Sequence, residues 1–139
     1  MRTIGLLGAF AAILLLSGCG DSGPKRYPIK GTVSFDGKPL PNGTIRFEPA
    51  GSESFSAESS IDAGKYSIEA IVGLGVGSYK VMISSGDPKQ MVKPGDAPGM
   101  EGMQPAAKDI IPAKYNLKSM LTAEVKASGD NVFDFTLTK

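Results

Sequence analysis

The chain has 139 residues, which suits one domain and leaves no room for two. Hydrophobic residues make up 41% of it and charged residues 21%, a composition that supports a buried core and excludes wholesale disorder. Lysine and arginine total 15 against 14 aspartates and glutamates, so there is no basic excess for nucleic acid. Histidine is absent, which removes the commonest general base and the imidazole metal ligand. We therefore expect no catalytic site, no metal site and no cofactor.

The first 18 residues have the profile of a signal peptide. Met1 and Arg2 give a positively charged start, and the 13 residues from Ile4 to Leu16 carry no charged or polar side chain. A helix needs about 20 apolar residues to cross the hydrocarbon core of a bilayer, so a permanent membrane span is the weaker interpretation. We predict that residues 1–18 are cleaved from the mature protein.

Residues Leu16, Ser17, Gly18 and Cys19 resemble the lipobox of bacterial lipoproteins. The resemblance implies a lipid thioether on Cys19, cleavage just before it, and acylation of the new amino group, for example with palmitate. Two or more acyl chains give the stable membrane anchoring that one chain does not. Gly20 replaces the aspartate that holds lipoproteins on an inner membrane, so we expect the extracytoplasmic side of the cell envelope, at the outer membrane where one exists. The alternative is an ordinary leader with an unmodified thiol.

Residues 19–26 are small, polar and prone to turns, which suits a lipidated tether, and the folded domain is expected over 27–139. Within the domain, apolar and polar side chains alternate with the period of a half-buried strand. Seven short strands are predicted in this way, over 29–35, 44–48, 55–61, 66–70, 79–83, 121–125 and 133–137. Asp36-Gly37 and residues 62–65 have the composition of tight turns. No convincing helix follows the leader, so an all-β sandwich is expected.

Three details of the arrangement can also be predicted. The serine-rich strand 55–61 is expected to lie at a sheet edge, where a partner can dock by strand addition. Strands 121–125 and 133–137 are expected to form a final hairpin around a turn at 128–131. Residues 84–109 contain many glycines and prolines and no apolar period, which predicts a long loop of the kind that carries function.

Residues 29–41 and 43–47 resemble the opening of the carboxypeptidase regulatory-like, transthyretin-like β-sandwich family. Residues 62–68 are similar to that family's turn and following strand, and residues 77–81 to its strand with a glycine, an aromatic residue and a valine. Residues 111–116 are similar to a tail found in small bacterial lipoproteins that carry this domain. The resemblance implies a seven-stranded, Greek-key-like sandwich that acts as an accessory or adhesion module. It brings no catalytic residue, because the hydrolase branch of the group uses histidines and a Tyr-Arg-Gly-Ser terminus that this chain lacks.

Two motifs suggest ligand chemistry only weakly. Met91, Met100 and Met103 lie in the long loop, and thioethers are ligands that Cu(I) prefers, but methionine is also a flexible filler and no cysteine or histidine supports the set. The glycines of residues 73–77 resemble a phosphate-binding loop, yet a strand follows where a helix is required. We keep the three methionines as candidates for partner binding and expect no bound metal.

The four tyrosines divide into two pairs. Tyr66 and Tyr79 fall on apolar strand faces and are predicted to lie in the core. Tyr27 and Tyr115 lie near the ends of elements, where an aromatic ring is available to a sugar or a protein, and Tyr115 is a candidate partner-binding residue. The carboxylates that might form an acid and base pair are expected to be solvated surface groups; they are Glu48, Glu53, Glu58 and Glu69.

These features predict a non-catalytic binding or assembly module, anchored in the cell envelope by lipid on Cys19. Its partners would be the membrane and an envelope protein or glycan, with the loop 84–109 displayed toward that partner. A carbohydrate-binding module is one alternative, and a small enzyme of unrecognised type is another.

Overall fold

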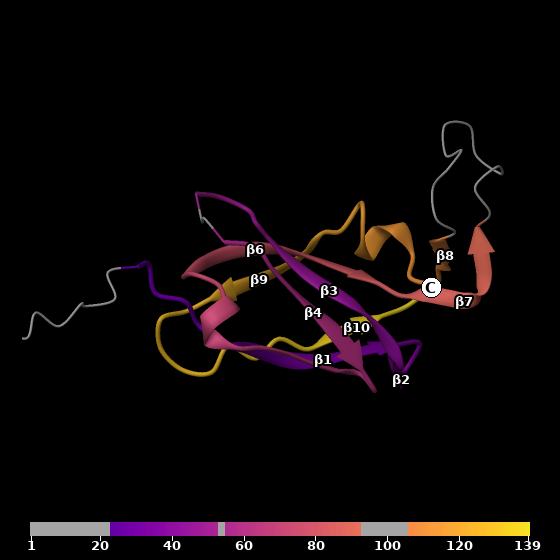
Figure 1. The fold of residues 1–139 in the computed structure, drawn as a ribbon, viewed down its shortest axis with the longest axis horizontal. Coiled ribbons are helices and arrows are strands. Elements are labelled where there is room, and N and C mark those ends of the chain that lie inside the picture. Colours follow the sequence, from indigo (N-terminus) through magenta and orange to yellow (C-terminus); the bar gives the residue numbers. More distant parts are fainter. Residues whose placement is uncertain (1–22, 53–54, 93–105) are drawn as a thin grey trace, which may run out of the picture.

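The computed structural model of the chain describes residues 23–52, 55–92 and 106–139. The leader, Cys19 and the start of the tether therefore lie outside the described residues. The described part is an all-β domain whose main sheet is largely antiparallel and strongly curled, in the manner of a half-barrel (Figure 1). Of the described residues, none belongs to a helix long and apolar enough to cross a membrane.

The main sheet has eight strands, in the order β10-β1-β5-β4-β3-β6-β9, with β2 beside β1. A separate ribbon consists of β7 and β8. The strands are β1 (Ile29–Phe35), β2 (Lys38–Pro39), β3 (Asn42–Pro49), β4 (Ala57–Asp62), β5 (Lys65–Ile68), β6 (Gly77–Ser84), β7 (Gly86–Val92), β8 (Ala106–Asp109), β9 (Leu121–Val125) and β10 (Phe135–Leu137). Two short 3-10 helices, η1 (Ala70–Val72) and η2 (Ala113–Tyr115), complete the described elements.

The core lies inside the curl of the sheet and follows from the alternation of side chains. In β6, Tyr79, Val81 and Ile83 are fully buried, while the residues between them face outward. Ile45 and Phe47 of the neighbouring β3 are also fully buried, because the antiparallel register sets them opposite Ile83 and Val81. The predicted strands 29–35, 44–48 and 79–83, and the faces they bury, are confirmed.

Two tight turns reverse the chain, and their central residues have positive φ angles, which most residues avoid. Asp36 and Gly37 have φ of 49° and 75°, and they join β1 to β2 as predicted. Ala63 and Gly64 have φ of 47° and 78°, and they join β4 to β5. Positive φ at both central residues matches the twist of the flanking strands, which explains the glycine at the second position of each turn.

Gly31 lies on the inner face of β1, where the alternation leaves a position without a side chain. That position is filled by its neighbours, because the Tyr66 hydroxyl donates a 2.7 Å hydrogen bond to the Phe133 carbonyl directly over Gly31. A Cβ at Gly31 would lie 1.8 Å from the Phe133 oxygen. Glycine is therefore required here for the close approach of residue 133 to β1.

The predicted final hairpin is wrong. β9 pairs with β6, and β10 pairs in parallel with β1, so these consecutive strands form the two opposite edges of the main sheet. The chain between them crosses from one edge to the other. The Asn131 side chain holds the start of this crossing, because it accepts from the Lys126 N–H at 2.9 Å and donates to the Lys126 carbonyl at 3.2 Å.

Two other expectations also need correction. β4 is not an edge strand, because six of its residues pair with β3 and Asp62 pairs with Lys65 of β5. Residues 84–109 are not simply a loop, since their ends form the antiparallel ribbon of β7 and β8. The local sequence does not predict this ribbon, because residues 86–92 include a glycine and a proline and do not alternate between apolar and polar side chains.

The close contact at Gly31 predicts a specific loss of stability. We expect Gly31→Ala to lower the free energy of unfolding by about 2 kcal/mol or more, since the added methyl group must displace a backbone carbonyl. Gly75→Ala is the matched control, because its Cβ would meet only ordinary contacts at 3.8 Å and the change should stay within about 1 kcal/mol. Urea unfolding followed by circular dichroism measures both. Equal effects in the two variants would contradict the packing described at Gly31.

Candidate functional site

Several loops meet at the end of the domain where the described chain begins, here called the entry end (left in Figure 1). Residues 23–27 run along η1 and the following loop, and the segment that leads into β4 lies beside them. The loop between β9 and β10 reaches the same end, where Asp130 and Asn131 line a hollow together with Tyr27 and Pro28. The entry end is thus built by segments from distant parts of the chain.

Tyr27 fixes the incoming chain to the domain. Its N–H donates to the Leu74 carbonyl at 2.8 Å, and its carbonyl accepts from the Leu74 N–H at 3.2 Å. This two-bond bridge brings the backbones so close that a Cβ at Gly73 would lie 2.1 Å from the Tyr27 oxygen. Tyr27 thus makes the first backbone pairing along the chain among the described residues.

Basic and apolar side chains surround this bridge. The Arg26 guanidinium lies 3.7 Å from the centre of the Phe55 ring, a cation–π contact. An open hollow of about 790 Å³ is lined by residues 23–27 together with Phe55, Ala70 and Ile71. A second open hollow, of about 370 Å³, lies between Lys25, Phe55 and Val76.

Three aliphatic side chains at the entry end are exposed. The exposed fractions are 84% for Ile71, 55% for Val72 and 54% for Val76. Together with Lys25 and Arg26, these residues are called the entry face from here on. This surface was not predicted from the sequence, although an apolar pair followed by the glycines of residues 73–77 breaks the strand alternation and was a usable signal.

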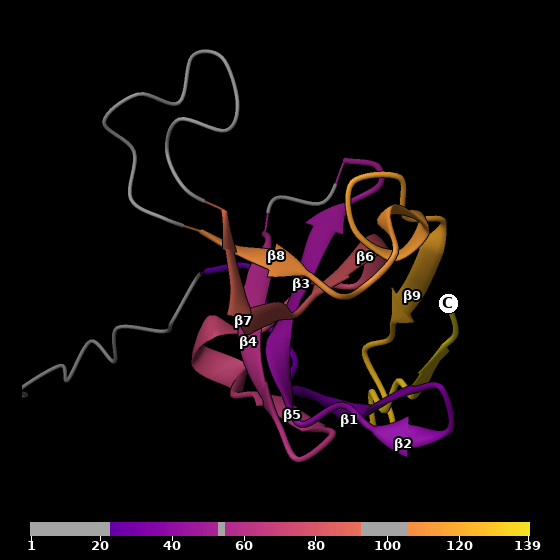
Figure 2. The same ribbon diagram turned by 90° about the vertical axis from the view of Figure 1, so that its right-hand side faces the viewer.

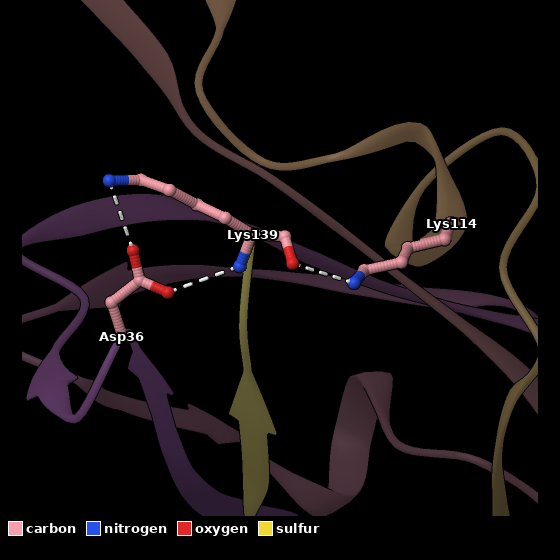
Figure 3. A network of polar contacts seen from close by, with 3 residues as sticks. All are labelled: Asp36, Lys114 and Lys139. Carbon is pink, nitrogen blue, oxygen red and sulfur yellow. Dashed lines mark hydrogen bonds and ion pairs between the residues drawn. The ribbon is translucent and has the colours of Figure 1, made fainter.

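The opposite end of the domain carries the β7–β8 ribbon and the last residues of the chain (Figures 1 and 2). Asp36 holds Lys139 there, since its carboxylate accepts from the Lys139 N–H at 3.1 Å and lies 3.3 Å from the Lys139 ammonium (Figure 3). The Lys114 ammonium donates to the Lys139 main-chain oxygen at 3.0 Å. These contacts join η2, β10 and the β1–β2 turn at the surface.

Tyr115, the predicted aromatic candidate, belongs to the same network. Its half-buried ring packs against the core, and its hydroxyl accepts from the Thr138 N–H at 3.2 Å and lies 3.3 Å from the Thr138 hydroxyl. The hydrogen bond with the Thr138 side chain is the main cause that lowers the pKa of Tyr115. Because its hydroxyl is already engaged, Tyr115 stabilises the chain end rather than presenting a free polar group.

A third surface lies on the outer face of the main sheet, under the segment that follows η2. An open groove of about 420 Å³ is lined by Thr44, Arg46, Glu58, Met82, Ser84, Asp109, Asn116 and Leu117. Asp109 accepts hydrogen bonds from the Ser85 and Ile111 N–H groups and from the Asn116 amide, so its carboxylate organises the backbone. Arg46 pairs with Glu48 at 3.3 Å in an exposed ion pair.

The three methionines are not brought into a described site. Met91 pairs with Ala107 in the ribbon, whereas Met100 and Met103 lie outside the described residues. The part of the chain that the structure describes contains no cluster of three or more His, Cys, Asp or Glu side chains placed to hold a metal. Glu58 and Glu69 are exposed as predicted, while Glu53 lies outside the described residues.

The core tyrosines were predicted correctly. Tyr79 is fully buried and its hydroxyl donates to the Gly75 carbonyl at 3.1 Å, and Tyr66 is 4% exposed. Burial raises the pKa of Tyr66 strongly, and the nearby charge of Asp134 raises it further. Tyr27 is half-buried and packs against the core.

Comparison with protein-family models, with curated proteins and with solved structures finds no match to this chain.

The raised pKa of Tyr66 predicts a pH dependence of stability. The folded state keeps the phenol protonated where the unfolded state ionises, so this contribution is complete below pH 10 and is lost as the pH rises further. In Tyr66→Phe, the decline of the unfolding free energy above pH 10 should be shallower by up to about 1.4 kcal/mol per pH unit. At neutral pH the same variant should lose about 1–3 kcal/mol, because the Phe133 carbonyl loses its donor. Urea unfolding between pH 7 and pH 11.5 measures both effects, and parallel curves for the two proteins would refute the assignment.

Proposed function

We propose that the protein is a lipid-anchored, non-catalytic binding or assembly module on the extracytoplasmic side of a bacterial cell envelope. The anchor is the lipid on Cys19, after removal of residues 1–18, and the membrane is the outer one where the cell has one. The support for the anchor is the apolar leader, its length and the lipobox-like residues that end at Cys19.

The observation that carries the proposal is the position of the two ends of the domain. The chain enters at one end, beside η1, and the β7–β8 ribbon lies at the other (left and right in Figure 1). A lipid attached a few residues before Gly23 would hold the entry end at the membrane. The ribbon would then lie at the end of the domain far from the bilayer, where a protein or glycan partner can reach it.

We further propose that the domain is a carboxypeptidase regulatory-like, transthyretin-like sandwich. In support, the resembling blocks coincide with structure: residues 29–41 cover β1, its turn and β2, residues 62–68 cover the second tight turn and β5, and residues 77–81 open β6. Members of that family act as accessory or adhesion modules, in keeping with a display role.

A glycan is the second candidate partner, favoured by the groove on the outer sheet face. Arg46 and Glu58 line this groove and offer a donor and an acceptor, as saccharide recognition requires. Saturable binding of an envelope glycan that is lost in Arg46→Ala but kept in Lys108→Ala would favour this alternative.

The display role is tested by site-specific photo-crosslinking in intact cells. A photo-reactive amino acid replaces Lys108, an exposed residue of β8, or Glu124, an exposed residue of β9 on the main sheet. We expect the probe at 108 to capture one reproducible envelope component, and the probe at 124 to capture much less of it. In Cys19→Ser the capture should fall together with recovery in the membrane fraction.

Two results would contradict the display role. Equal capture at positions 108 and 124 would mean that the ribbon is not the contact surface. Undiminished membrane recovery of Cys19→Ser would mean that lipid on Cys19 is not the anchor.

A further inference from the structure

The entry face combines features that a water-facing surface of a monomer seldom shows together. Ile71, at 84% exposure, and Val76, at 54%, flank the hollows that Lys25 lines. Exposing branched aliphatic side chains to water is unfavourable in free energy. A cluster of them beside basic groups is therefore typical of a binding surface.

We propose that the entry face docks on an anionic membrane surface. Ile71, Val72 and Val76 enter the interfacial layer, and Lys25 and Arg26 contact lipid phosphates. This inference rests on the proposed lipid anchor and adds that the folded domain itself touches the bilayer in a fixed orientation.

The length of the chain between anchor and domain restricts the alternatives. Four residue steps separate Cys19 from Gly23, so even a fully extended chain spans no more than about 14 Å. The polar layer on each side of the hydrocarbon core is itself about 5–8 Å thick. A lipid on Cys19 would therefore hold Gly23, and the hollow that it lines with Ile71, at or just above the headgroups.

Charge favours the same occupant. Among the residues that the structure describes, neither Lys25 nor Arg26 forms an ion pair, and Arg26 lies over the Phe55 ring. The exposed Glu69 precedes η1 and offsets one of these charges, while Asp130 is paired with Lys30 at 4.0 Å. Basic residues near a bilayer are attracted by anionic lipids, and aliphatic and aromatic side chains beside them bury apolar area in the interface.

The absence of tryptophan from the chain allows a direct experiment. Full-length Ile71→Trp is expressed in bacteria, purified from membranes with its lipid, and reconstituted in vesicles of phosphatidylethanolamine and phosphatidylglycerol. We expect blue-shifted emission and strong quenching by lipids brominated near the headgroup end of the acyl chain. Leu117→Trp is the matched control, since Leu117 is 86% exposed but lies on the groove beyond η2, and it should be quenched weakly.

Charge removal provides the second part of the test. Lys25→Ala and Arg26→Ala, each in the Ile71→Trp background, should lower the ratio of docked to undocked domains by about fivefold per cation removed. Replacing phosphatidylglycerol by phosphatidylcholine should have a similar effect. Val76→Trp repeats the measurement should Ile71→Trp disturb the fold.

The outcomes separate this inference from the proposed function. Protein that sediments with vesicles but shows equal, weak quenching at 71 and 117 would overturn membrane docking and leave the anchor intact. A blue shift at 71 that depends on protein density and not on brominated lipid would assign the entry face to a second copy instead. Protein purified without lipid on Cys19 would refute the anchor itself.

Discussion

The parallel docking of residues 131–137 on β1 is the contact on which the shape of the domain depends. It joins segments about a hundred positions apart, through Lys30 with residues 131 and 133, Thr32 with Asp134, and Val33 with Phe135. Because β9 already lies on β6 at the other edge, this docking curls the sheet around its core. Gly31 allows this docking by leaving space for the Phe133 carbonyl, and the Tyr66 hydroxyl stabilises it by donating a hydrogen bond to that carbonyl.

The same contact shows what local sequence reveals about this fold and what it does not. Alternation located β1, β3 and β6 and their buried faces, since the period of side chains is a local property. Glycine after Asp36 located the first tight turn for the same reason. The partner of β10 could not be predicted, because a hairpin with β9 and a parallel pairing with β1 bury the same residues. The place of β4 inside the sheet was missed for a similar reason. Its serines suggested an edge, although both belong to paired backbone and the half-buried Ser59 lies opposite the buried Ile45 of β3.

The candidate surfaces were predicted less completely than the fold. Tyr115 was found by its type and position, but its role in holding Thr138 depends on a chain end that only the fold brings near. Lys25 and Arg26 lie in the segment predicted to be a tether. They form a candidate surface only together with Ile71 and Val76, which the Tyr27–Leu74 bridge brings beside them. The distinct roles proposed for the two ends of the domain thus depend on tertiary structure, which sets the entry end and the ribbon apart.

The lipid on Cys19 is the central claim, because both the orientation of the domain and the docking of its entry face depend on it. Mass spectrometry of the protein purified from membranes tests it most directly. The account predicts an N-terminal peptide that begins at Cys19 and carries a diacylglyceryl thioether, with or without a further acyl group on the amino nitrogen. A peptide that begins at Met1, or one that begins at or after Cys19 with no lipid, would contradict it.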